Sequence, residues 1–159
     1  MNYSSKSEQT TPVEERKLHN SYIKELIALF EKKDYRVIIE GAIPQFWGKE
    51  WAEPDIFVLK GLRLEKIVEV TISDSKEGKE QNSVLNKCKK IREYYNPPEI
   101  IVFEPTGYTD NHYPKIPKGF AHHSGYNAYL QEKWRKEGLN VTFWNEWNLE
   151  EQKEKANEP

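Results

Sequence analysis

Two acidic residues on consecutive strand-like segments could carry chemistry in this chain. Asp55 precedes an apolar run at residues 56–59, and Glu69 lies within a second apolar run at residues 66–72. Both runs are short and rich in β-branched residues, which is typical of buried strands, and residues 60–63 between them predict a hairpin. Two carboxylates on neighbouring buried strands are costly, because each loses hydration and the two repel each other. A divalent cation bound between them removes both costs, so the pair indicates a metal centre.

Each acid taken alone also has a structural explanation. Asp55 could cap the start of its strand after Pro54, and Glu69 could pair with a lysine of the following helix. Structural ion pairs of this kind perturb acids as functional sites do. The two acids occur together, however, and a basic helical segment follows them, which favours the metal centre. Side chains alternate along a strand, so Glu69 shares its face with Thr71.

The residues Pro54–Asp55, a spacer and then Glu69–Val70–Thr71 resemble the PD-(D/E)xK nuclease superfamily, with a layout similar to archaeal Holliday-junction resolvases. That family places a helix, a strand, the Pro-Asp strand, the Glu-x-Lys strand, a helix and a further strand in this order, and the resemblance covers roughly residues 13–104. It implies a restriction-endonuclease-like α/β fold, a central mixed β-sheet flanked by helices. The order of periodic segments along the chain also indicates an α/β domain. One departure is plain: Thr71 occupies the lysine position of the family.

The resemblance also implies a mechanism. Asp55, Glu69 and the backbone carbonyl of Val70 would hold Mg²⁺ (or Mn²⁺), which polarises the scissile phosphate and activates a water molecule. In the family the lysine steadies that water, whereas Thr71 offers a hydroxyl without charge. Losing such an electrostatic group costs roughly a hundred- to a thousand-fold in rate. A lysine of the next helix could substitute, and the candidates, in order of nearness to the start of that helix, are Lys79, Lys87 and Lys90.

A third acidic ligand is expected from the first helix or the first strand. Residues 13–33 have helical periodicity, and in the resemblance this helix supplies an acid near the metal. Glu25 is the candidate, with Glu15 and His19 as alternatives. Glu25 could equally face water, as most helix glutamates do. Glu40, in a strand predicted at residues 36–43, is a rival for the same role.

A basic helix and an aromatic loop are the candidate nucleic-acid contacts. The formal net charge of the chain is −2, so attraction to DNA must be local. Residues 76–92 contain six basic and two acidic residues. The basic residues expected to contact phosphates are Lys79, Lys87, Lys89, Lys90 and Arg92. Trp47 lies in a loop with two other aromatic residues, where it could stack on bases or simply cover the core.

Length and composition predict the organisation of the chain. Its 159 residues suggest one domain at residues 13–149, after a disordered segment at 1–12 and before a charged flexible tail at 150–159. The single cysteine, Cys88, excludes an internal disulfide and favours a reducing compartment. No apolar run reaches membrane-spanning length, and a signal-peptide core is missing. These features predict a cytoplasmic protein without membrane contact.

The last third of the chain is expected to add a helix at residues 124–136 and a strand at 139–147, after a long loop at 105–119. The histidines in or just after that loop match no zinc signature. Aromatic residues in this region exceed what a small core needs and could form a homodimer contact, since junction-resolving relatives act as two-fold dimers. These residues are Tyr126, Tyr129, Trp134, Trp144 and Trp147.

Two functions remain open. The first is a metal-dependent endonuclease that hydrolyses phosphodiester bonds in DNA. The second is an inactive nuclease-like fold that serves as a DNA-binding or protein-interaction module. Thr71 at the lysine position favours the second. The presence of both acids favours the first, because an inactive chain has no use for buried carboxylates that repel each other.

Overall fold

The computed structural model describes residues 12–39, 54–71, 79–105 and 125–158. In chain order the elements are α2 (Pro12–Lys32), β1 (Arg36–Ile39), β2 (Ile56–Lys60), β3 (Arg63–Val70), α3 (Lys79–Tyr95), β4 (Glu99–Phe103), α4 (Gly125–Lys136), β5 (Val141–Trp144) and α5 (Glu146–Ala156). This order confirms the expected α/β fold. Among the described helices, none is long and apolar enough to cross a membrane.

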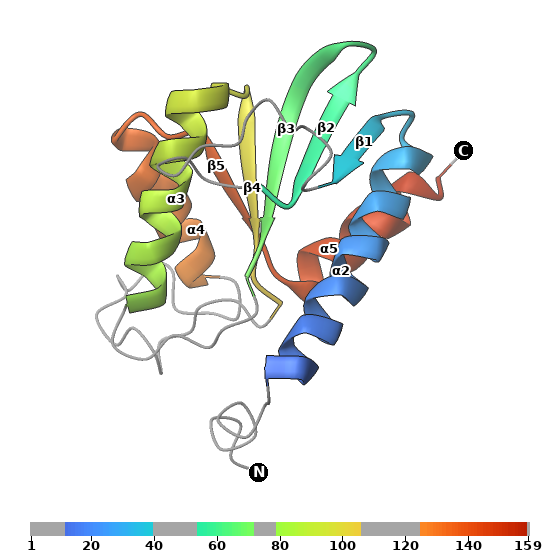
Figure 1. The fold of residues 1–159 in the computed structure, drawn as a ribbon, viewed down its shortest axis with the longest axis horizontal. Coiled ribbons are helices and arrows are strands. Elements are labelled where there is room, and N and C mark those ends of the chain that lie inside the picture. The colour runs from blue at the N-terminus through green and yellow to red at the C-terminus, as the bar shows by residue number, and fades with distance from the viewer. Residues whose placement is uncertain (1–11, 40–53, 72–78, 106–124, 159) are drawn as a thin grey trace.

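The five described strands form one mixed sheet in the order β1-β2-β3-β4-β5. The pairs β1–β2 and β2–β3 are antiparallel, and the pairs β3–β4 and β4–β5 are parallel. Helices α3 and α4 cover one face of the sheet, and α2 and α5 cover the other (Figure 1). The sheet flanked by helices is consistent with a restriction-endonuclease-like layout.

The hairpin between β2 and β3 forms where the sequence predicts it and sets the register of the two acids. Gly61 has a φ of 63°, a left-handed conformation that glycine adopts without steric cost. Ile56 lies opposite Val68 in this antiparallel pair. One residue further along, Asp55 therefore lies opposite Glu69.

The same alternation decides which face the acids occupy. Phe57 and Ile67 belong to the core under α3 and α4, and their neighbours Ile56 and Val68 belong to the core under α2 and α5. Because successive side chains point to opposite faces, Glu69 lies on the α3–α4 face.

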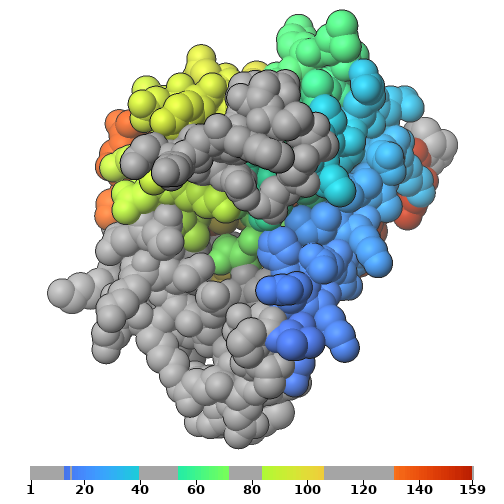
Figure 2. All heavy atoms as spheres, in the orientation of Figure 1, coloured from blue at the N-terminus to red at the C-terminus, as the bar shows by residue number. Residues whose placement is uncertain are grey.

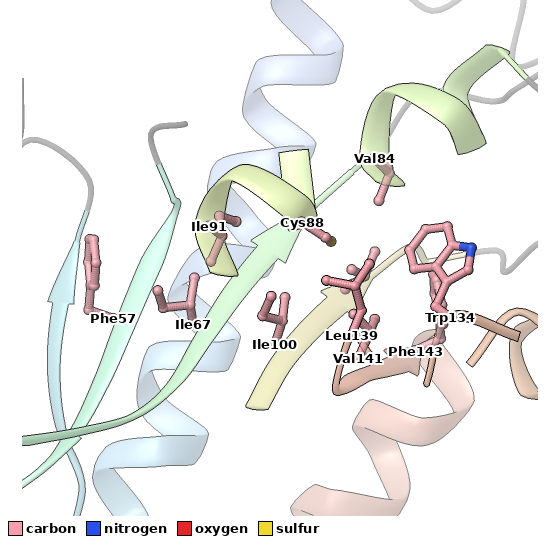
Figure 3. Close-up of a cluster of buried hydrophobic side chains, with 11 residues drawn as sticks. Phe57, Ile67, Val84, Cys88, Ile91, Ile100, Trp134, Leu139, Val141 and Phe143 are labelled. Atoms are coloured by element: carbon pink, nitrogen blue, oxygen red, sulfur yellow. The ribbon is translucent and has the colours of Figure 1, made fainter. Parts of the chain in front are cut away.

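Two apolar clusters hold the layers together. The cluster on the α3–α4 face consists of Phe57, Ile67, Val84, Cys88, Ile91, Ile100, Val102, Trp134, Leu139, Val141 and Phe143 (Figure 3). The cluster on the α2–α5 face consists of Tyr22, Leu26, Leu29, Phe30, Ile56, Val58, Val68, Val70, Ile101, Phe103 and Leu149. The sheet is therefore buried on both faces, as its near-continuous apolar strands indicate.

Residues 150–156, which lie in the segment expected to form a charged flexible tail (150–159), continue helix α5. Asn145 ends the expected strand early: its side chain accepts a hydrogen bond from the Asn148 N–H, and the Asn148 side chain accepts one from the Asn145 N–H. This reciprocal capping starts the helix. Leu149 is fully buried against α2, and Lys33 of the α2–β1 connection donates a hydrogen bond of 2.9 Å to Gln152.

Two of the aromatic residues expected at a dimer contact pack in the core of the protomer instead. Trp134 is fully buried, and Trp144 stacks on Phe30 with 6.0 Å between ring centroids. Trp147 is 61% exposed. The side chains of Tyr126 and Tyr129 lie outside the described part of the structure. The homodimer therefore stays a prediction, and fewer aromatic residues are available to form its contact.

Candidate active site

Asp55 and Glu69 are brought together as the sequence predicts. Both are buried, with exposed fractions of 7% and 5%. Each carboxylate accepts a hydrogen bond from the backbone of the other strand end: Asp55 N–H donates to Glu69 Oε1 at 3.0 Å, and Val70 N–H donates to Asp55 Oδ2 at 2.8 Å. The pair is thus fixed by the sheet itself, at the start of β2 and the end of β3.

Lys87 supplies a cation to this pair from helix α3. Its Nζ lies 2.6 Å from Glu69 Oε2, and its side chain is half-buried. The apolar residues Val84, Cys88 and Ile91 pack α3 onto the sheet, which directs the neighbouring Lys87 toward the end of β3. In Figure 2, green atoms of β3 reach the surface between α2 and α3.

His19 supplies the second contact, from helix α2. Its Nε2 lies 3.3 Å from Asp55 Oδ2, and its side chain is 29% exposed. The helix covers the opposite face of the sheet, and its first turns extend past the ends of the strands (Figure 1). This overhang allows a residue of α2 to reach an acid on the α3–α4 face.

Asp55 and Glu69 are two buried like charges, and the positive charge of Lys87 offsets only part of the cost of burying Glu69 beside Asp55. Burial, together with the charge of Asp55, raises the pKa of the Glu69 carboxyl to about 8, although Lys87 acts in the opposite direction. The hydrogen bond to Asp55 raises the pKa of His19 above its ordinary value, against the opposing effect of burial. A proton or another cation is therefore favoured at this site.

The donor chemistry of the pair fits a divalent cation. Adjacent carboxylate oxygens are the ligands that Mg²⁺ and Mn²⁺ prefer, and the raised pKa of Glu69 comes first from burial and then from the charge of Asp55, two costs that a bound cation would relieve. As they stand, the side chains are engaged with one another. Within the described residues, no group of three or more His, Cys, Asp or Glu side chains is arranged to hold an ion. Binding would require contacts such as that of His19 with Asp55 to rearrange.

Glu25, the expected third ligand, lies elsewhere. Its carboxylate pairs with Lys153 of α5, on the α2–α5 side of the sheet. The alternative His19, six residues earlier, occupies the place expected for Glu25. Glu40 and Trp47 lie outside the described residues, and so do the loop at 106–124 and its histidines.

The basic helix divides into two parts. Lys89 and Lys90 are exposed, while Lys87 turns toward Glu69. Arg92 lies against the turn before β5, where a Cβ at Gly138 would be 3.1 Å from its Nη1. Because this turn is at the opposite end of the sheet from Glu69, Arg92 does not join the surface beside the acids. Lys79 begins α3, but its side chain lies outside the described part.

Two further residues stand beside the pair. Thr71 directly follows β3, is half-buried and donates its N–H to the Phe103 carbonyl at 2.8 Å. Glu104, which was not among the expected site residues, is 2% exposed. The parallel register of Val70 with Phe103 places Glu104 next to Thr71, on the face that carries Glu69. The signal in the sequence that could have identified Glu104 is its position directly after the apolar run at residues 100–103.

Comparison with protein-family models, with curated proteins and with solved structures finds no match to this chain.

Proposed function

We propose that the protein is a metal-dependent endonuclease that hydrolyses phosphodiester bonds in DNA at Asp55 and Glu69. The observation that carries this proposal is the contact of Lys87 with Glu69 at 2.6 Å. It adds a cation to two adjacent buried carboxylates, which is the set of charges that the Pro-Asp and Glu-x-Lys pattern brings together in a single site. The fold, with its mixed sheet between helices, supports the same proposal.

Each residue has a distinct role in this proposal. Asp55 and Glu69 hold Mg²⁺ or Mn²⁺, with the Val70 carbonyl as a further oxygen donor. When bound, the ion supplies Lewis acidity to the phosphate and lowers the pKa of a water molecule. Lys87 supplies the positive charge that Thr71 lacks, and it takes precedence over Lys79 because its contact with the pair is observed.

Contact with DNA is assigned to the exposed side of α3. Lys89 and Lys90 are exposed on the helix that carries Lys87. Lysines displace counterions from DNA phosphates, and a local basic strip suffices for this in a chain whose net charge is −2. Such contacts would hold the sugar-phosphate backbone of the DNA near the carboxylate pair without base-specific contacts.

Cleavage of a panel of structured DNAs tests the proposal. Junction, flap, duplex and single-stranded substrates are incubated with the purified protein and Mg²⁺ or Mn²⁺. We expect at least one to be cut, and we expect Asp55→Asn and Glu69→Gln to abolish cutting while DNA binding is kept or improved, because each removes a negative charge near phosphate. Cleavage by Asp55→Asn at the parent rate would place the chemistry elsewhere.

An inactive binding module is the second candidate, and one observation favours it. The contacts observed for the acid pair in the described part of the chain are internal: two backbone N–H groups, Lys87 and His19. A closed set of this kind can serve stability alone. Calorimetric titration with Mn²⁺ and Mg²⁺ separates the two functions, because the module has no reason to bind either ion at this pair and Asp55→Asn would leave any weak binding unchanged.

A further inference from the structure

Arg16 lies one turn before His19 on helix α2 and is exposed. Residues three apart are neighbours on one side of a helix, so Arg16 projects from the side of α2 on which His19 reaches Asp55. The first turns of α2 extend past the ends of the strands (Figure 1), and helical side chains lean toward the N-terminus of their helix. The Arg16 side chain is therefore directed beyond the edge of the sheet, beside the approach to the acid pair.

The charge of Arg16 is not used by the part of the fold that the structure describes. Among the described residues its guanidinium takes part in no ion pair, whereas Lys87 and His19 both contact the acid pair. An exposed arginine offers five N–H donors in a rigid planar fork. That fork matches the geometry of two phosphate oxygens, so Arg16 is suited to bind the backbone of a nucleic acid.

A phosphate that approaches the acid pair needs positive charge on both sides of it. The end of β3 reaches the surface between α2 and α3 (Figure 2), and the exposed Lys89 and Lys90 supply charge from the α3 side. On the α2 side, Lys17 is exposed as well, but residues two apart on a helix project in nearly opposite directions. Lys17 therefore points away from the direction of His19, and Arg16 is left as the cation that faces the approach.

We propose that Arg16 binds a phosphate of the DNA strand next to the acid pair, so that the strand is held from α2 as well as from α3. This inference rests on the DNA binding of the proposed function and names a residue that performs it. Arg16 touches phosphate oxygens and takes no part in activating water. Its loss therefore acts on the affinity for DNA and not on the chemistry of the bound complex.

Fluorescence anisotropy with labelled junction, flap, duplex and single-stranded DNA, in the presence of a chelator, measures binding without cleavage. Arg16→Gln should weaken binding of the preferred DNA on the order of tenfold, because one charge-assisted hydrogen-bonded contact is lost. The slope of the logarithm of affinity against that of salt concentration should become shallower by about 0.7–0.9, the contribution of one phosphate. Lys17→Gln is the matched control, since it removes the same charge from the same turn, and it should leave affinity and slope almost unchanged.

Arg16→Lys separates the geometry of the contact from its charge. We expect the parent salt slope, because one phosphate is still neutralised, and only part of the parent affinity, because an ammonium lacks the planar fork. In cleavage assays with Mn²⁺, the defect of Arg16→Gln should be large at low DNA concentration and largely overcome at saturating DNA. A defect that persists in full at saturation would contradict a role in binding.

The outcomes separate this inference from the proposed function. Equal losses in Arg16→Gln and Lys17→Gln, or an unchanged affinity and slope in Arg16→Gln, overturn the role of Arg16 and leave the nuclease proposal standing. Binding that depends on Arg16, without cleavage of any substrate, overturns the nuclease and keeps Arg16 as a phosphate contact. No binding to any of the four DNAs overturns both.

Discussion

Lys87 is the residue on which activity is expected to depend after the two acids. Lys87→Met removes the charge 2.6 Å from Glu69 while keeping much of the side-chain length. We expect the single-turnover cleavage rate at saturating DNA and metal to fall roughly a hundred- to a thousand-fold, the cost of losing one electrostatic group from such a site. Lys133→Met, an exposed lysine of α4, is the control and should cut at the parent rate.

Thr71→Lys tests whether the charge can be supplied from the strand instead. Thr71 follows β3 on the face that carries Glu69, so a lysine there can approach the same carboxylate. We expect Thr71→Lys combined with Lys87→Met to recover part of the rate lost in Lys87→Met alone. Equal rates for the single and the double variant would mean that Lys87 acts through its own geometry and not through its charge.

The Glu69 carboxyl should make the metal-free protein less stable as pH rises. Its pKa is about 8 in the folded state and 4.5 ordinarily, so the folded state binds its proton more tightly than the unfolded state does. The free energy of unfolding is therefore highest below about pH 4.5 on this account and falls as pH rises toward 8. The raised pKa of His19 acts in the same direction.

Urea unfolding in the presence of a chelator, at several pH values between 5 and 8, measures this dependence. Glu69→Gln should remove the larger part of the slope, because the amide does not titrate in this range. Adding Mn²⁺ at pH 8 should raise the stability of the parent protein, since an ion that binds only the folded state stabilises it. A slope that is unchanged in Glu69→Gln would assign the pH dependence to other groups.

Helix α5 is the element whose contribution to stability is least expected from its sequence. Its Leu149 is fully buried in the cluster on the α2–α5 face. Leu149→Ala should lower the free energy of unfolding by about 2–5 kcal/mol, from lost burial and the cavity left behind. Glu151→Ala, an exposed change on the same helix, should have almost no effect. Equal urea midpoints for the two variants would mean that the last helix is dispensable.

The strands were predictable and this helix was not, for a physical reason. The runs around Phe57 and Ile67 are apolar and β-branched, and Gly61 between them suits the observed turn, so local pattern and tertiary structure agree. The last helix buries little besides Leu149, and more than half of its residues are charged, so its apolar periodicity is weak. Its start depends on reciprocal hydrogen bonds between two asparagines, a signal less common than the Ser/Thr and Glu pattern.

Within the site, strand residues could be placed from the sequence and helix residues could not. Alternation fixes the face of Glu69 once the strand is recognised. For α2, the choice between Glu25 and His19 depends on how far the helix extends beyond the sheet, which periodicity does not report. The sequence analysis ranks Lys87 after Lys79 because Lys79 lies nearer to the start of the helix. Which lysine contacts Glu69 depends instead on the direction in which α3 packs on the sheet.

At the scale of the whole molecule, binding to DNA should be weak and strongly dependent on salt. The net charge of −2 gives no general attraction, so a few lysines must carry it. Each phosphate contact contributes a slope of about −0.9 to the logarithm of affinity against that of salt concentration. Replacing Lys89 and Lys90 by Gln together should reduce the slope by up to about 2. An unchanged slope in a fluorescence anisotropy titration would move the binding surface away from α3.

The crossed hydrogen bonds between the two acids and the backbone have a consequence for how this chain can change over time. Asp55 and Glu69 accept buried N–H groups at the ends of β2 and β3, so they join the strands as well as carrying charge. Removing such an acceptor costs about 1–3 kcal/mol. A related sequence without the proposed cleavage activity is therefore expected to keep an acceptor at both positions and to exchange acid for amide. Asparagine at 55 or glutamine at 69, and not alanine, would mark the loss of catalysis in related sequences.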